Sequence, residues 1–139
     1  MNPVISRIKK GDQVMPRSIR VKVELGGYKL VELKLSEAKA LLKKAWDAGR
    51  RTRDIEETMR VLNNFDEFYR LQVKKNKSFL TPPKDLKEQL TGQTLVDKVR
   101  LDQRGEERFV TIVFDKRVSK DQIKELLSSI GYEKMLLEE

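Results

Sequence analysis

Apolar and charged residues alternate in two neighbouring stretches near the start of the chain. The first covers residues 18 to 25 and the second residues 28 to 35, with Gly26 and Gly27 between them. A period of two residues is typical of strands that bury one face, and paired glycines supply the positive φ angles of a tight turn. We therefore expect a β-hairpin over these residues.

Three longer stretches have the apolar spacing of amphipathic helices. The first begins at Ser36, a good N-cap, and ends at Gly49. The last begins at a capping box of Ser119 and Gln122 and ends before Gly131. Between them, residues 52 to 73 are expected to form one long helix with an apolar stripe that consists of Ile55, Met59, Leu62, Phe65 and Tyr69.

The second half of the chain holds another pair of predicted strands, over residues 95 to 101 and 108 to 114. Residues 109 to 114 are nearly all apolar, so both faces of this strand should be covered and the strand should lie centrally in its sheet. Ahead of the pair, a short helix is expected to begin at Thr81 and end at Leu90, because Pro82 and Pro83 suit a first helical turn.

Both ends of the chain follow the order hairpin, then serine-capped helix. We therefore expect the α+β fold class: one antiparallel or mixed sheet of about four strands, made of two ββα units, with helices packed on it and a central helical hairpin. Residues 1 to 16 have no period and carry Pro3 and Pro16, so they are expected to form a flexible basic arm. Residues 17 to 139 are expected to form a single α+β domain.

Positive charge is concentrated in the first third of the chain. Residues 1 to 53 hold 14 Lys and Arg against 5 Asp and Glu, whereas the whole chain has a formal net charge of +8. A surface of one sign is readily neutralised by a polyanion, so nucleic acid, either DNA or RNA, is the expected partner. The candidate binding residues lie on the arm, the hairpin and the turn after Gly49, and they are Arg7, Lys9, Lys10, Arg20, Lys22, Lys29, Lys34, Arg50, Arg51 and Arg53.

The hairpin cations suggest one mode of binding. Arg20, Lys22, Lys29 and Lys34 are expected to form a basic face beside Tyr28, and such a face suits single strands or RNA. The alternative is a plain solvent face whose lysines discourage edge-to-edge pairing.

The arginine cluster, which consists of Arg50, Arg51 and Arg53, suggests another mode of binding. Ala45, Gly49 and Ile55 have the spacing of a helix-turn-helix, which residues 41 to 59 resemble. The alternative is an ordinary helical hairpin in which Gly49 ends the first helix. The arginines at the helix N-terminus are either a candidate phosphate site or a solvated cap, because acidic residues in the same turn also satisfy the helix dipole. The resemblance implies groove-facing positions at Arg51, Thr52, Arg53, Glu56, Glu57 and Arg60.

The chain has no cysteine and no histidine. Disulfides, thiolate nucleophiles, the usual zinc sites and histidine bases are therefore absent, and we expect a protein that is not an enzyme and uses no metal or cofactor. Glu32-Leu33-Lys34 resembles the metal-binding strand of PD-(D/E)xK nucleases, but the partner aspartate is missing. Charged residues make up 37% of the chain and no apolar run is long enough to span a membrane, so we expect a soluble, cytoplasmic protein.

A second hypothesis belongs to a different class, a protein–protein adaptor or regulatory module that binds an acidic partner protein. Its apolar anchor would be the stripe of residues 52 to 73 or the tail Met135-Leu136-Leu137. The sequence also leaves open a homo-oligomer and the choice between DNA and RNA.

Overall fold

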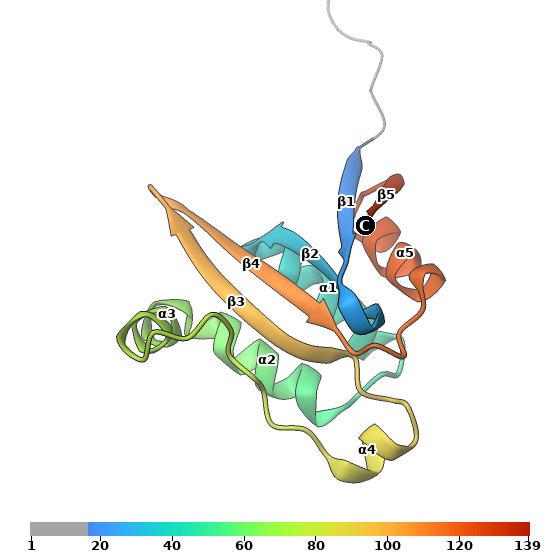
Figure 1. Ribbon diagram of the computed structural model, residues 1–139, viewed down its shortest axis with the longest axis horizontal. Helices are drawn as coiled ribbons and strands as arrows, with labels where there is room; N and C mark the ends of the chain where they lie inside the picture. Colours follow the sequence, from blue (N-terminus) through green and yellow to red (C-terminus); the bar gives the residue numbers. More distant parts are fainter. Residues whose placement is uncertain (1–16) are drawn as a thin grey trace, which may run out of the picture.

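The structure is a computed structural model that describes residues 17 to 139 (Figure 1). Its strands are β1 (Ser18–Val23), β2 (Lys29–Lys34), β3 (Val96–Arg104), β4 (Glu107–Phe114) and β5 (Lys134–Glu138). Its helices are α1 (Leu35–Asp47), α2 (Arg53–Asn63), α3 (Phe65–Lys74), α4 (Leu86–Leu90) and α5 (Lys120–Ser129), with a short 3-10 helix, η1 (Leu25–Gly27), between β1 and β2. The five strands form one mixed sheet, which confirms the expected α+β class.

The strand order is β3-β4-β2-β1-β5, so β4 and β2 form the centre of the sheet. These two strands pair antiparallel, with Glu32 opposite Thr111. Each has its own hairpin partner on the outside, and the chain continues into α1 after β2 and into α5 after β4. The two predicted ββα units are thus joined through their second strands. Residues 110 to 114 of β4 are buried, which confirms the prediction of a central strand covered on both faces.

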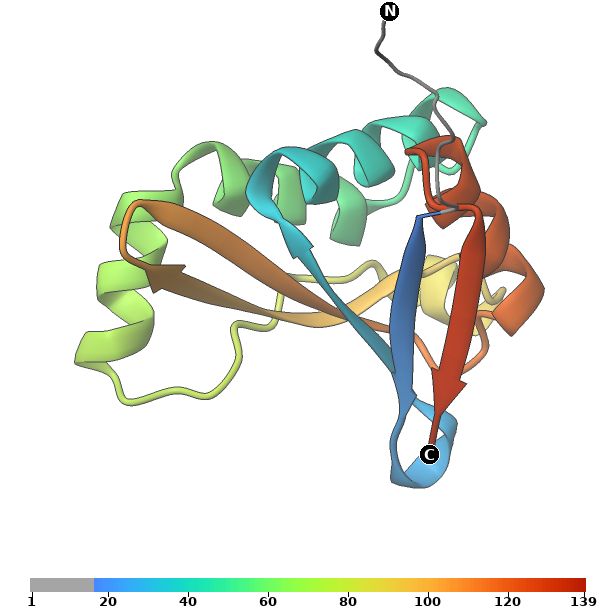
Figure 2. The same cartoon turned by 90° about the horizontal axis from the view of Figure 1, so that it is seen from above.

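Helices α1, α2 and α5 pack on one face of the sheet, and Figure 2 shows α1 and α2 lying along that side. Leu41, Ile55 and Ile123 from these helices belong to one core cluster together with the strand residues that face them. Alternate strand residues point the other way, toward what we call the open face. Thr111 and Val113 of β4 point to this side and are 1% and 2% exposed, so the open face is accessible at the neighbouring strands and at Phe109 but is covered over the middle of β4.

Strands β1 and β2 diverge from the turn that joins them. They pair through Lys22 with Leu30 and through Val23 with Lys29, whereas β1 pairs in parallel with β5 from Ser18 onward. The side chains of Arg17, Glu37 and Tyr132 connect the separated segments. Arg17 Nη2 and Tyr132 Oη both donate to Glu37 Oε2, at 2.7 and 2.9 Å. They tie the start of β1 and the segment before β5 to the first turn of α1.

The prediction of one helix over residues 52 to 73 is wrong. Asn64 has non-helical backbone angles (φ −123°, ψ 45°) and separates α2 from α3. Its Nδ2 donates to the carbonyl oxygen of Arg60 at 2.8 Å and so satisfies an acceptor at the end of α2. Leu62 and Phe65 are both buried, so the apolar stripe continues across the break, and its spacing alone does not reveal the break.

The starts of two helices and one additional strand also differ from expectation. α1 begins at Leu35, one residue before Ser36, because the Glu37 side chain accepts a hydrogen bond from the Lys34 N–H at 3.1 Å. α4 is capped by Asp85 rather than Thr81. The pattern predicts no strand at β5, whose residues do not alternate and whose parallel partner β1 lies at the other end of the described chain.

Candidate nucleic-acid interface

The open face carries side chains in rows that cross the sheet, because residues opposite one another in neighbouring strands share a face. One row crosses all five strands and consists of Lys98, Val113, Leu30, Lys22 and Glu138. The next two rows consist of Arg100, Thr111 and Glu32, and of Asp102, Phe109 and Lys34. The cations that β1, β2 and β3 place on this face are Arg20, Lys22, Lys34, Lys98, Arg100 and Arg104.

Two phenylalanine rings lie beside cations of the open face. On β4, the ring centre of Phe109 is 3.9 Å from the guanidinium carbon of Arg104. Phe79 precedes Leu80, which the backbone of β3 holds at the sheet edge, and its ring centre lies 4.6 Å from Lys98 Nζ. The guanidinium carbon of Arg100 lies 5.3 Å from the same ring. Rings and guanidinium planes are the groups on which nucleobases stack.

Acidic neighbours orient two of these arginines. Arg104 Nη2 lies 2.7 Å from Glu32 Oε2 on β2, and Arg100 Nε lies 3.2 Å from Asp102 Oδ2. The hydrogen bond to Glu32 raises the pKa of Arg104. Exposed ion pairs contribute little to stability. Their effect here is positional, because Glu32 holds the guanidinium over the Phe109 ring.

Three predicted binding residues, Arg20, Lys22 and Lys34, point to the open face, but β1 and β2 pair only next to their turn, so Lys34 lies at the far end of β2 from Arg20 and Lys22. Lys29 lies on the opposite, helix-covered face, where its Nζ is 3.5 Å from the carbonyl oxygen of Val118. The four hairpin cations are therefore divided between two faces of the sheet, with Lys34 apart from the other two on the open face. The predicted arm residues Arg7, Lys9 and Lys10 fall outside the residues that the structure describes.

The arginine cluster after Gly49 lies in the helix layer, so the sheet separates it from the open face. Arg50 is half-buried and structural: its Nε donates to the carbonyl of Gln93 at 3.0 Å and its Nη2 to that of Thr94 at 3.3 Å. Burial lowers the pKa of Arg50. These bonds tie the α1–α2 turn to the segment before β3.

The other two arginines of the cluster keep exposed side chains. The guanidinium carbon of Arg51 lies 5.7 Å from the Trp46 ring. The backbone N–H of Arg53 donates to Glu88 Oε1 at 2.9 Å. Glu88 thereby occupies part of the α2 N-terminus that a phosphate would use.

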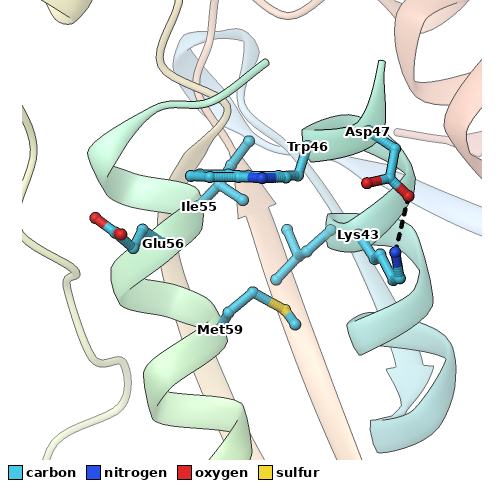
Figure 3. A pocket seen from close by; sticks show the side chains of 7 residues that line it. Lys43, Trp46, Asp47, Ile55, Glu56 and Met59 are labelled. Carbon is cyan, nitrogen blue, oxygen red and sulfur yellow. Dashed lines mark hydrogen bonds and ion pairs between the residues drawn. The ribbon is translucent and has the colours of Figure 1, made fainter. Parts of the chain in front are cut away.

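Helices α1 and α2 form the helical hairpin that was the alternative to a helix-turn-helix. Figure 3 shows them running antiparallel side by side. Thr52, one of the groove-facing positions that the resemblance implies, is 3% exposed. Gly49 ends α1 with a φ of 104°, which only glycine adopts easily.

An apolar groove lies between α1 and α2 (Figure 3). Trp46, Ile55 and Met59 contribute to its walls, and the ion pair of Lys43 with Asp47 (2.9 Å) borders it. Ile55 itself is buried, as are most members of the stripe of residues 52 to 73. The apolar surface that this stripe leaves for a partner is therefore the groove.

Within residues 17 to 139, no group of three or more metal-ligating side chains is close enough together to hold an ion. No helix in the same range has the length and apolar character needed to cross a membrane. No protein-family model matches the sequence, and neither a curated protein nor a solved structure is similar enough to count as a match. Function is therefore argued from the site itself.

Five residues of the candidate interface lie outside the predicted set: Phe79, Lys98, Arg100, Arg104 and Phe109. They belong to the second half of the chain, where acidic and basic residues nearly balance. The net charge of that half therefore did not indicate a binding surface there. The alternation within β3 contains the signal, because Lys98 and Arg100 alternate with the buried Val99 and Leu101. The sequence does not show that the cations of β3 and β1 share one face, because this depends on how the strands pair in the fold.

Proposed function

We propose that this protein binds single-stranded nucleic acid on the open face of its sheet and acts by binding rather than by catalysis. The observation that supports the proposal is the placing of aromatic rings beside cations on one surface. Cations contact phosphates, and flat side chains stack on bases that a duplex would hide. The residues that we assign to binding are Arg20, Lys22, Lys34, Phe79, Lys98, Arg100, Arg104 and Phe109.

Arg104 and Phe109 form the central pair of this proposal. The guanidinium lies over the ring and is held there by Glu32. A base stacks on the outer side of the guanidinium, or takes its place on the ring when Arg104 turns toward a phosphate. Every base has a flat π-face, so this mode of binding carries little sequence preference. Lys22, Lys34 and Lys98 lie on three different strands and hold the backbone along the sheet.

Fluorescence anisotropy with labelled oligothymidylate, oligouridylate and a DNA duplex tests the proposal. We expect both single strands to bind more tightly than the duplex, because only their bases are free to stack. Phe109→Ala should weaken single-strand binding about tenfold or more and leave its salt dependence unchanged, since stacking is not ionic. Circular dichroism checks that the variant is folded. Absence of binding at low salt, or unchanged binding by a folded variant, contradicts the proposal.

Charge reversals locate the binding surface. Lys22→Glu combined with Lys34→Glu alters two cations of the open face and should greatly weaken binding. The matched control is Lys120→Glu combined with Lys124→Glu, which makes the same change in net charge at exposed positions of α5. The control should have a much smaller effect. Equal losses from both pairs would mean that binding follows total charge and not the open face.

A second candidate function, an adaptor for an acidic partner protein, is favoured by the groove in Figure 3. An apolar side chain of the partner would enter the groove, while its carboxylates would meet Lys43 and Arg51. Trp46 is the single tryptophan of the chain and lies in the groove, so its fluorescence distinguishes the two functions. A partner in the groove shifts the emission maximum, whereas a single strand on the open face leaves the maximum unchanged.

A further inference from the structure

The two edges of the sheet differ in whether their backbone groups are paired. At the β3 edge, the N–H and the carbonyl of Val99 both pair with Leu80, at 2.9 and 2.7 Å. The next outward residue, Leu101, pairs both groups with the side chain of Gln72. Lys84 Nζ donates to the carbonyl of Asp97 at 2.7 Å. Both outward groups of Val99 and Leu101 and the carbonyl of Asp97 are therefore paired, so this part of the edge offers no continuous row of groups to another strand.

In the part of the chain that the structure describes, no strand pairs with the outer edge of β5. Within residues 17 to 139, β5 pairs with β1 and is the last strand of the sheet, and Figure 2 shows the two strands side by side. The N–H of Lys134 donates to the carbonyl of Arg17 at 3.0 Å, so the backbone groups of Lys134, Leu136 and Glu138 point toward β1. Those of Met135 and Leu137 consequently point outward. Leu136 and Leu137 are also exposed, at 41% and 43%.

We propose that a second copy of this chain occupies the β5 edge, with the two β5 strands paired antiparallel about Leu136. In this register Leu136 faces its own copy, and Met135 faces Leu137 of the second copy. The outward backbone groups of Met135 and Leu137 then exchange hydrogen bonds, as an antiparallel ladder requires. Lys134 lies opposite Glu138 of the second copy, and the two-fold symmetry repeats this opposite-charge pair.

Within the strand Lys134–Glu138, charge and polarity favour this register over its neighbours, although beyond the strand ends it sets Glu133 opposite Glu139 of the second copy. Shifting the centre to Met135 places Lys134 opposite Leu136, and shifting it to Leu137 places Leu136 opposite Glu138. Both shifts pair a charge with an apolar side chain and lose the Lys134–Glu138 match. The strand Lys134–Glu138 is therefore self-complementary in a single antiparallel register. The resulting dimer joins two sheets edge to edge and is independent of the function proposed above.

Sedimentation equilibrium measures the association. The wild-type chain should form a dimer, and both Lys134→Glu and Glu138→Lys should raise the dimer dissociation constant about tenfold or more, because each change creates two like-charge pairs. An equimolar mixture of the two variants should dimerise as well as wild type, since residues 134 and 138 again carry opposite charges across both symmetry-related pairs of the mixed dimer. Lys120→Glu, on the exposed surface of α5, is the control that should leave the association unchanged.

The mixture makes the test specific to the proposed register. Both substituted side chains are exposed, and circular dichroism with thermal melting verifies that each variant keeps its fold. A wild-type chain that stays monomeric at millimolar concentration overturns the proposal. The β5 edge would then be a binding site for a different protein and not for a second copy. A dimer that both variants leave intact, or that their mixture fails to restore, overturns it as well.

Discussion

The side chain of Gln72 pairs with the backbone of Leu101 as a neighbouring strand would. Gln72 Nε2 donates to the Leu101 carbonyl at 2.8 Å, and the Leu101 N–H donates to Gln72 Oε1 at 3.0 Å. Gln72 is 6% exposed and Leu101 is fully buried, so water does not compete for these groups. One helix side chain thus satisfies both edge groups of a buried strand residue and fixes α3 against β3.

Gln72→Leu should therefore lower the free energy of unfolding by about 2 to 4 kcal/mol, because it leaves a buried donor and a buried acceptor without partners. Chemical denaturation measures the change. Gln103→Leu is the matched control, since Gln103 is an exposed glutamine on the same strand, and it should cost less than about 0.5 kcal/mol. Equal stabilities of the two variants would show that the Gln72 pair has no special role.

Stability should depend on pH through Glu37. Burial raises the pKa of Glu37, but hydrogen bonds from the Lys34 N–H, Arg17 and Tyr132 outweigh burial and lower the pKa below the ordinary 4.5. Unfolding releases these bonds, so the network stabilises the fold above pH 4.5, and the contribution disappears as the pH falls through the lowered pKa.

Glu37→Gln tests this dependence. The variant should be less stable than wild type at neutral pH, by about 1 kcal/mol, and the difference should shrink as the solution is acidified below the ordinary pKa of a glutamate. Thermal melts at a series of pH values measure it. A difference that stays constant from neutral to acid pH would assign the loss to packing instead of ionisation.

The central position of β4 predicts a large penalty for a charge in that strand. Ile112 is fully buried between β2 and β3, so Ile112→Asp should unfold the protein, because an unpaired buried charge costs several kcal/mol against a total stability of roughly 5 to 15 kcal/mol. Arg20→Asp, on the open face, should keep the fold. A native melting temperature for Ile112→Asp would contradict the sheet order.

The three arginines after Gly49 should separate into two classes. Arg50→Glu should destabilise the fold, since it removes two hydrogen bonds to the backbone before β3 and brings a second carboxylate toward the buried Asp54. Arg51→Glu combined with Arg53→Glu should leave the melting temperature nearly unchanged and should have little effect on single-strand affinity. A large loss of affinity from this double variant would move the binding surface to the helix layer.

The salt dependence of single-strand affinity should show how many phosphates the open face contacts. For a single strand, the slope of log affinity against log salt changes by about 0.7 for each phosphate contact, so Lys22→Ala combined with Lys34→Ala should reduce the slope by about 1.4. Titrations between about 50 and 200 mM salt measure the slope. An unchanged slope in the double variant would remove both lysines from the interface.

Elements whose signals are local were predictable from the sequence. The glycine turn, the alternating runs, the capping box of Ser119 with Gln122 and the end of α1 at Gly49 depend on residues close to one another in the chain. The break at Asn64 was not predictable in this way, because the apolar stripe continues through it. The strand β5 depends on a parallel partner at the far end of the described chain, so its own residues show no strand period.

The candidate site, too, was only partly predictable from the sequence. The gathering of cations in the first third and the alternation of Lys98 and Arg100 with apolar residues are visible in the sequence. Only the tertiary structure decided which cations share a surface: pairing of β2 with β4 brings the two hairpins onto one open face, while the sheet separates Lys29 and the arginine cluster from it. The physical reason is that side-chain direction follows the local strand period, whereas neighbourhood on a sheet is set by hydrogen-bonded register between segments distant in the chain.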